Sequence, residues 1–136
     1  MPQVSSAFVA DRELIEHLEK RAKPVDVSAD RVLFHKGDAP VGVFVIRKGA
    51  VALTSQSDGD ALLSVQAGVG SLLGVPAVVA TKPYSLTAEA EEGAEVSVIP
   101  SEDFVQLMRT DPALAFHVLQ VLAEEVRFAR ETLSHL

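Results

Sequence analysis

Residues 42–53 read GVFVIRKGAVAL, and this stretch decides the fold. Two runs rich in β-branched and aromatic residues, 43–47 and 51–55, flank the pair Lys48-Gly49. Such runs favour strands, and glycine readily adopts the positive φ that a tight turn needs. The stretch therefore predicts two neighbouring strands joined by a short turn.

Further strands are expected on both sides of this pair. They are predicted over 25–28, 32–35, 62–66, 84–91 and 95–99. Turn residues separate them, and Asp58-Gly59 is the strongest local signal for a hairpin. Because many short strands at regular spacing are typical of sandwiches and rolls, we expect a β-roll over 24–100.

Helical patterns flank this β region. Asp11 is predicted to cap a helix over 11–23, which Pro24 ends. Ser101 is predicted to cap a short helix over 101–109. The fold expected is mainly β with flanking helices, within a single domain of 136 residues.

A long terminal helix is predicted over 111–136, with Asp111 as its cap and Pro112 at its first position. One apolar stripe follows the spacing of a coiled coil: Ala115, Leu119, Leu122, Val126, Ala129, Leu133 and Leu136. A second stripe comprises Leu114, Val118, Val121 and Phe128. Two stripes indicate two partners, the β-roll and a second copy of the chain. The alternative is a helix buried on both sides within one domain.

Composition excludes several classes of protein. The chain has no cysteine, so disulfides, cysteine-ligated clusters and thiol catalysis are excluded, and a cytoplasmic location is expected. Its net charge of −7 disfavours binding to nucleic acid by this chain alone. No apolar run is long enough to span a membrane, and no signal peptide is recognised. We expect no catalytic residues, no cofactor and no metal site, since the four histidines show no ligand spacing.

Two phrases resemble the cyclic-nucleotide-binding domain of the catabolite-activator and FNR-type regulators. They are residues 33–38, LFHKGD, and 42–53, in which Gly37 and Gly49 fall at the family's turn glycines. The resemblance implies a double-stranded β-helix, or jelly roll, that senses a small molecule. The coiled-coil stripe of the terminal helix independently predicts a homodimer, with Leu119, Leu122, Val126, Ala129 and Leu133 at the interface.

The family's phosphate-binding segment corresponds to residues 68–88, GVGSLLGVPAVVATKPYSLTA. The resemblance implies a Gly-Glu pair that holds the ribose and an Arg-Ser or Arg-Thr pair that holds the cyclic phosphate. Here Gly74 is retained, but Val75 stands in place of the Glu. Tyr84-Ser85 stands in place of Arg-Ser, and Leu86 follows. Both charged anchors are therefore missing.

Two interpretations of this segment stay open. In one, Val75 and Tyr84 fill a vestigial pocket. In the other, a remodelled pocket binds a different ligand, with Tyr84 stacking on it and Ser85, Thr87 and Arg130 in polar contact. Lys82 could supply a point charge, without the bidentate geometry of a guanidinium.

The sequence thus predicts a non-catalytic sensory or assembly module that does not bind cAMP in the usual way. The alternative is the regulatory half of a transcription factor of the same family. An enzyme on a roll scaffold has no supporting residues.

Overall fold

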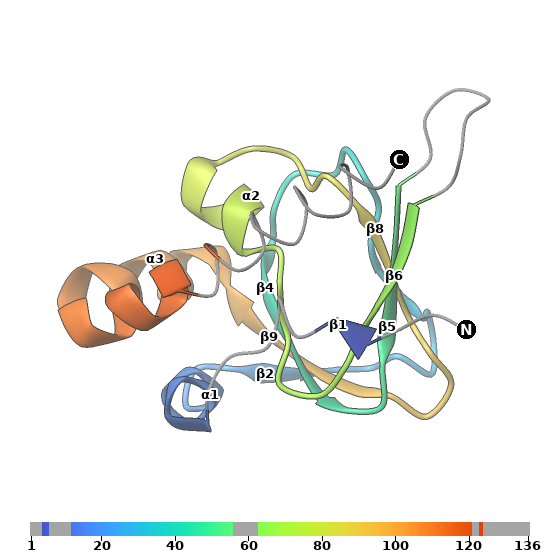
Figure 1. Cartoon of the computed structure of the whole chain (residues 1–136), viewed down its shortest axis with the longest axis horizontal. Coiled ribbons are helices and arrows are strands. Elements are labelled where there is room, and N and C mark those ends of the chain that lie inside the picture. Colours follow the sequence, from blue (N-terminus) through green and yellow to red (C-terminus); the bar gives the residue numbers. More distant parts are fainter. Residues whose placement is uncertain (1–3, 6–11, 56–62, 121–122, 124–136) are drawn as a thin grey trace.

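Two β-sheets form the body of the molecule in the computed structural model (Figure 1). The structure describes residues 4–5, 12–55, 63–120 and 123. The first sheet has the strand order β1 (Val4–Ser5), β6 (Leu63–Ala67), β5 (Val51–Ser55), β8 (Thr87–Ala90), β3 (Val32–Phe34). The second has the order β2 (Lys23–Val25), β9 (Glu95–Pro100), β4 (Gly42–Lys48), β7 (Leu72–Leu73). Apart from the parallel pair β1 and β6, the paired strands are antiparallel. The predicted mainly β roll with flanking helices is confirmed.

From Gly42 to Ile46, strand β4 is buried on both of its faces, which explains why this part of its sequence is apolar without interruption. Phe44 and Ile46 belong to an apolar cluster between the sheets, together with Phe34, Val51, Leu53, Leu73 and Tyr84. Val43 and Val45 belong to a second cluster beneath the helices, together with Leu18, Leu72, Ile99 and Phe104. Successive side chains on a strand point to opposite faces, so β4 joins the two clusters.

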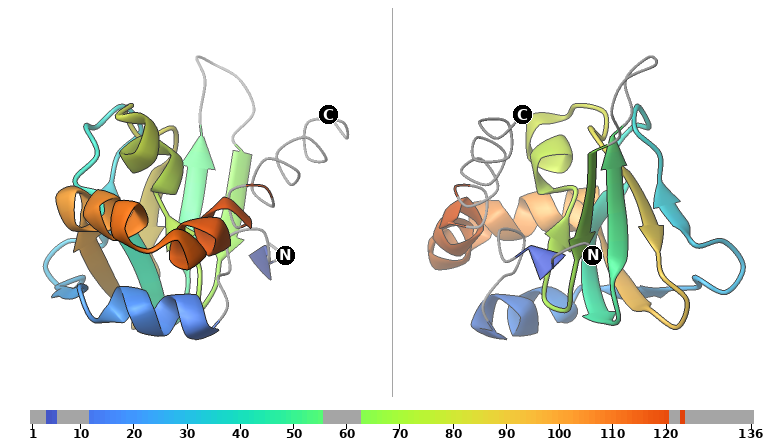
Figure 2. Two further views of the ribbon diagram at one scale, coloured as in Figure 1. Left: turned by 90° about the vertical axis from the view of Figure 1, so that its left-hand side faces the viewer. Right: turned by 45° about the vertical axis from the view of Figure 1, so that its right-hand side comes forward.

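The helices cover the outer face of the second sheet (Figure 2). They are α1 (Arg12–Glu19), α3 (Ser101–Thr110) and a helical segment over 112–120. Leu18, Phe104 and Leu114 are their buried contacts with the sheet. An ion pair between Arg47 Nε and Glu19 Oε1 at 3.3 Å also links α1 to β4. None of the helices in the described part of the chain is long and apolar enough to cross a bilayer.

The predicted end of the first helix is wrong. α1 ends at Glu19, and residues 23–25 form strand β2 by pairing with Val96–Val98 of β9. Pro24 is accommodated because β2 lies at the edge of its sheet, where a missing N–H breaks no ladder. Pairing with a distant strand therefore outweighed the local helical pattern.

Residues 26–28, predicted as strand, form a turn instead. The Asp26 carboxylate accepts hydrogen bonds from the Ser28 hydroxyl at 2.5 Å and from the Ser28 N–H at 3.0 Å. These bonds, chiefly that from the hydroxyl, hold the pKa of Asp26 below its usual value. Aspartate competes well with strand pairing through such local bonds.

The two later helix starts differ in how they are capped. Asp111 is confirmed as a cap, because its Oδ1 accepts a hydrogen bond from the Leu114 N–H at 3.1 Å. Ser101 is not the cap of α3: it is the first helical residue, and its hydroxyl points to the Pro40 carbonyl at 3.5 Å. The predicted Asp58-Gly59 hairpin and the Asp11 cap lie outside the described residues.

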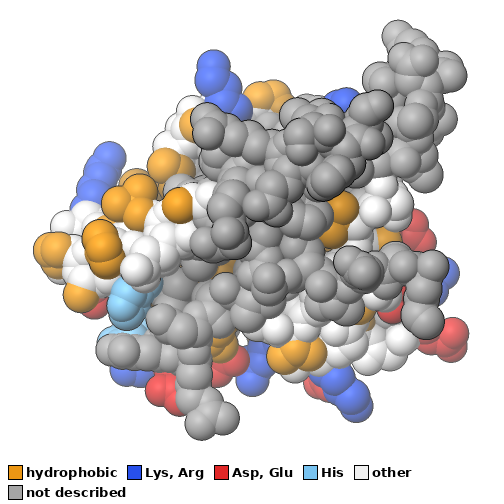
Figure 3. All heavy atoms as spheres, in the orientation of Figure 1, with side chains coloured by type: hydrophobic (Ala, Val, Ile, Leu, Met, Phe, Trp, Pro, Cys, Tyr) orange, Lys and Arg blue, Asp and Glu red, His pale blue; other side chains and the backbone are white. Residues whose placement is uncertain are grey.

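Large apolar side chains also reach the surface. Within the described ranges, these are Val41, Val69, Val79, Phe116 and Leu119. Figure 3 shows hydrophobic side chains on the face formed by α2 (Val75–Ala80) and α3.

Candidate functional site

The candidate site is built by the segment from Gly68 to Leu86. A glycine turn opens the segment, with the Ser71 N–H donating to the Gly68 carbonyl at 3.2 Å. Strand β7 follows and pairs with β4, and α2 begins directly after Gly74. The chain then returns through residues 81–86 to β8 (Figure 1). A short apolar helix therefore lies between a glycine turn and a return loop.

Gly74 is held in a conformation that suits glycine. Its φ is 89°, in the left-handed region, and it occupies the N-cap position of α2. A Cβ at this position would lie 2.7 Å from Cε1 of Tyr84 and 3.3 Å from the Gly42 carbonyl oxygen. Gly74 therefore permits both the turn into α2 and the close approach of the tyrosine ring.

Tyr84 is part of the core. Its side chain is 2% exposed, and its ring stacks on Phe34 with a centroid distance of 3.8 Å. Its hydroxyl donates to the Gly42 carbonyl at 2.8 Å and accepts from the N–H groups of Val41 at 3.0 Å and Gly42 at 3.2 Å. The hydrogen-bonding capacity of the hydroxyl is thereby filled by backbone groups.

Backbone hydrogen bonds fix the same residue to the turn before β4. The Tyr84 N–H donates to the Asp38 carbonyl at 2.9 Å, and the Tyr84 carbonyl accepts from the Gly37 N–H at 2.8 Å. The Asp38 carboxylate in turn accepts from the His35 N–H at 3.0 Å. Tyr84 therefore joins the return loop to residues 35–42 at several points.

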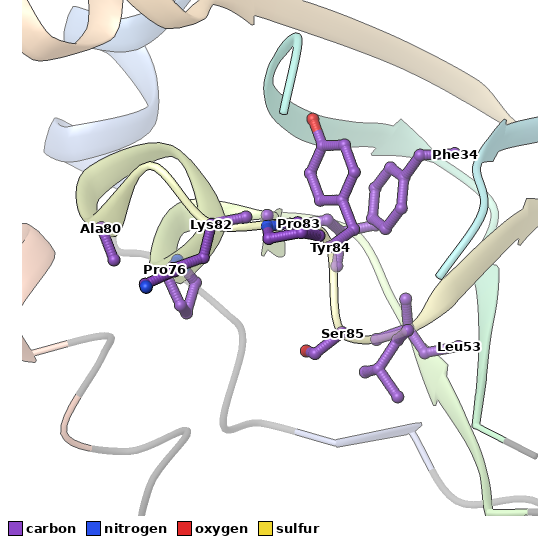
Figure 4. A pocket seen from close by; sticks show the side chains of 12 residues that line it. Phe34, Leu53, Pro76, Ala80, Lys82, Pro83, Tyr84 and Ser85 are labelled. Atoms are coloured by element: carbon purple, nitrogen blue, oxygen red, sulfur yellow. The ribbon is translucent and has the colours of Figure 1, made fainter. Parts of the chain in front are cut away.

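A pocket of about 270 Å³ lies beneath α2 and the return loop (Figure 4). Most of the side chains that line it are apolar: Phe34, Leu53, Leu73, Pro76, Ala77, Ala80, Pro83, Tyr84 and Leu86. Lys82 and Ser85 add polar groups at its rim, and both residues are exposed. Figure 4 shows the Ser85 hydroxyl directed into the space between α2 and Leu53, and Lys82 extended along Pro76.

The structure brings together five of the predicted ligand-binding residues. Gly74, Lys82, Tyr84, Ser85 and Leu86 all line the pocket. Val75 does not line it: this residue is fully buried in the second apolar cluster, beneath the helices. Arg130 lies outside the described residues.

Thr87 does not line the pocket either. Its hydroxyl accepts a hydrogen bond from the Lys36 N–H at 3.0 Å. The phase of α2 explains the position of Val75, because Val75 and Val78 share one face of the helix and both pack under the helical layer. Pro76, Ala77 and Ala80 are left to face the pocket.

Several lining residues were missed by the sequence analysis. Phe34 and Leu53 were recognised only as strand residues, and Leu73 was not assigned to a strand. Their alternation along β3 and β5 predicts that they point inward. No local signal could show that the inward positions of these strands end under α2.

Two positions in the first turn of α2 offer an anion no free N–H group. Pro76 has no N–H, and the Val78 N–H already donates to the Gly74 carbonyl at 3.1 Å. At the other end, the N–H of Lys82 donates to the Ala77 carbonyl at 3.0 Å. Among the residues described, no group of three or more histidine, aspartate or glutamate side chains could hold a metal ion.

Comparison with known proteins places this site in a familiar fold. The chain resembles the crystal structure of the catabolite activator protein of Thermus thermophilus, with a TM-score of 0.77 and 22% identity over 91% of this chain and 59% of that one. It also resembles a transcriptional regulator of Thermotoga maritima, with a TM-score of 0.70 and 17% identity over 88% of this chain and 94% of the other.

Two curated relatives have different activities. The transcriptional activator protein FnrA of Stutzerimonas stutzeri is 28% identical over 90% of this chain and 49% of its own length. Lysophospholipase NTE1 of Chaetomium globosum is 24% identical over 84% of this chain but only 8% of its own length. The chain thus spans about half of the activator and a small part of the lysophospholipase.

The family model that matches is the cyclic nucleotide-binding domain, over residues 24–111. This range contains both sheets except β1 and the first residue of β2, and it contains α2, the pocket and α3. It also includes the two phrases that carried the resemblance in the sequence. The chain belongs to the cyclic nucleotide-binding domain family.

Proposed function

We propose that this chain is a non-catalytic sensory module whose pocket does not bind cyclic nucleotides in the family's usual way. The observation that carries the proposal is the engagement of the Tyr84 hydroxyl by Gly42 and Val41. The position that the resemblance assigns to a phosphate-binding arginine is occupied by a side chain whose polar atom is already satisfied. Tyr84 can then offer a ligand the edge of its ring but no new hydrogen bond.

The position of Val75 supports the same proposal. The resemblance assigns a ribose-binding glutamate to this position, but Val75 is fully buried among apolar side chains and does not line the pocket. A carboxylate here would be desolvated without a partner, which is costly. The two anchors are therefore not replaced by other charged groups at the same positions.

We expect cAMP and cGMP to bind at least a hundredfold more weakly than to a domain with both anchors. Loss of one partner of a buried charged pair costs about 2–5 kcal/mol, and loss of a hydroxyl's hydrogen bond about 1–3 kcal/mol. A micromolar site would then weaken by roughly two to six powers of ten. Isothermal titration calorimetry with both nucleotides, beside a family member that has the Glu and Arg anchors, measures this. A micromolar dissociation constant for either nucleotide would refute the proposal.

The proposed module acts as a homodimer through its terminal helix. Leu119 is 59% exposed, whereas Leu114 and Val118 on the opposite face are each 3% exposed and packed against the sheet. The contrast between an exposed Leu119 and a buried Leu114 and Val118 supports the interpretation that the helix has two apolar stripes with two partners. Leu122, Val126, Ala129 and Leu133, which complete the predicted interface, lie outside the described residues.

Leu119→Ala is expected to raise the dimer dissociation constant about thirtyfold. Each copy loses roughly 1 kcal/mol of apolar burial, and a dimer contains two copies. Sedimentation velocity over a range of concentrations measures the change. Gln120→Ala is the matched control, because Gln120 is exposed on the same helix and outside the predicted stripe. A wild-type chain that sediments as a monomer at tens of micromolar would contradict the dimer.

A second candidate function is the regulatory half of a transcription factor. The observation that favours it is the similarity to FnrA, which covers 90% of this chain and 49% of the activator. A helix-turn-helix segment encoded in the same reading frame after Leu136 would support this function. A stop codon there would contradict this second function and favour the sensory or assembly module.

A further inference from the structure

We infer that the pocket beneath α2 binds a small carboxylic acid with an apolar body. This inference rests on the proposed function, since it assumes that cyclic nucleotides are not the pocket's ligands. It commits to one ligand class, a monoanion whose hydrocarbon part enters the pocket and whose carboxylate stays at the rim.

The apolar lining sets the character of the ligand's body. The walls are formed by aromatic and aliphatic side chains from both sheets and from α2, of which Phe34, Leu53 and Leu73 are central. A nucleobase or a ribose would lose hydrogen bonds to water here without gaining any from these side chains. A hydrocarbon chain or a single aromatic ring loses no hydrogen bonds on entry.

The volume sets the ligand's size. About 270 Å³ equals the volume of roughly nine water molecules at ~30 Å³ each. A six-carbon aliphatic acid or a benzoic acid is of this scale.

Lys82 and Ser85 set the charge of the ligand's polar end. Lys82 is the one charged residue among the described residues that line the pocket. In the described part of the chain, neither its Nζ nor the Ser85 hydroxyl has a hydrogen-bond or ion-pair partner. A single ammonium suits a single carboxylate, whereas a phosphate is better matched by a bidentate guanidinium.

Isothermal titration calorimetry with hexanoate and its neutral isostere hexanamide tests the inference. We expect hexanoate to bind with a dissociation constant below about 1 mM. Hexanamide should bind about fivefold more weakly, the effect of one exposed ion pair. Because Tyr84 is the sole tyrosine and the chain has no tryptophan, a change in its fluorescence on titration reports binding at this pocket.

Three variants separate the parts of the site. Lys82→Met should weaken hexanoate about fivefold and leave hexanamide unchanged. Lys48→Met removes the same charge at the turn between β4 and β5 and should change neither. Ala80→Trp places a large side chain at an exposed lining position, so it should abolish binding while the melting temperature is retained.

The outcomes distinguish this inference from the proposed function. The carboxylate inference alone would be overturned by any of three results. These are equal binding of hexanoate and hexanamide, equal effects of Lys82→Met and Lys48→Met, and no binding by hexanoate or benzoate. Micromolar binding of cAMP would overturn the proposed function, and the inference with it.

Discussion

Gly74→Ala is expected to lower the free energy of unfolding by about 2–5 kcal/mol. The left-handed backbone at this residue costs an L-residue about 1–2 kcal/mol, and overpacking adds about 1–3 kcal/mol. Overpacking follows because the new methyl group would lie 2.7 Å from Cε1 of Tyr84, whose ring is held between Phe34 and the Gly42 backbone. Urea denaturation followed by far-ultraviolet circular dichroism measures the loss.

Gly93→Ala is a matched control for this prediction. Gly93 has a φ of 83°, but a Cβ there would meet no heavy atom within 4 Å. Its substitution therefore isolates the backbone cost, and we expect a loss of about 1–2 kcal/mol. If the two variants were equally stable, the contact between Gly74 and the tyrosine ring would not contribute, and the close packing of the pocket's wall would be disproved.

The two long strands of the second sheet, β4 and β9, could be predicted from the sequence because their apolar runs are local. Residues 43–47 and 95–99 were expected as strands, and β4 and β9 span Gly42–Lys48 and Glu95–Pro100. The helix over 101–109 was likewise expected, and α3 covers Ser101–Thr110. In each case the hydrophobic pattern and the turn residues indicate the same element.

The boundaries that failed depend on partners far away in the chain. Lys23–Val25 forms a strand only because β9 is available to pair with it, and nothing within residues 11–28 indicates this. Thr87–Ala90 is the observed part of the strand expected over 84–91, since Tyr84 turns into the core instead. The Tyr84 hydroxyl bonds to Gly42, 42 positions earlier, a contact that local patterns do not predict.

The candidate site was predictable only through the family resemblance. The resemblance marked Gly74, Tyr84 and Ser85, and the structure places all three at one pocket. It also marked Val75, whose side chain the phase of α2 directs to the opposite side. Alignment thus identifies the segment, whereas the direction of each side chain depends on packing.

Tyr84→Phe is expected to lower the free energy of unfolding by about 2–3 kcal/mol, because it leaves the buried Gly42 N–H and carbonyl without their side-chain partner. The ring and its stacking on Phe34 are retained, so the loss reports the hydroxyl alone. Urea denaturation followed by circular dichroism measures the stability, and amide hydrogen exchange at Val41 and Gly42 locates the effect. We expect faster exchange at these two amides.

Ser85→Ala is the control for Tyr84→Phe, since it removes the neighbouring hydroxyl. That hydroxyl is exposed and has no partner among the described residues, so we expect a change below about 0.5 kcal/mol. Unchanged stability and unchanged exchange at Val41 and Gly42 in Tyr84→Phe would show that the hydroxyl is free. A free hydroxyl could then bind a ligand, and the main argument against ordinary nucleotide sensing at this position would fail.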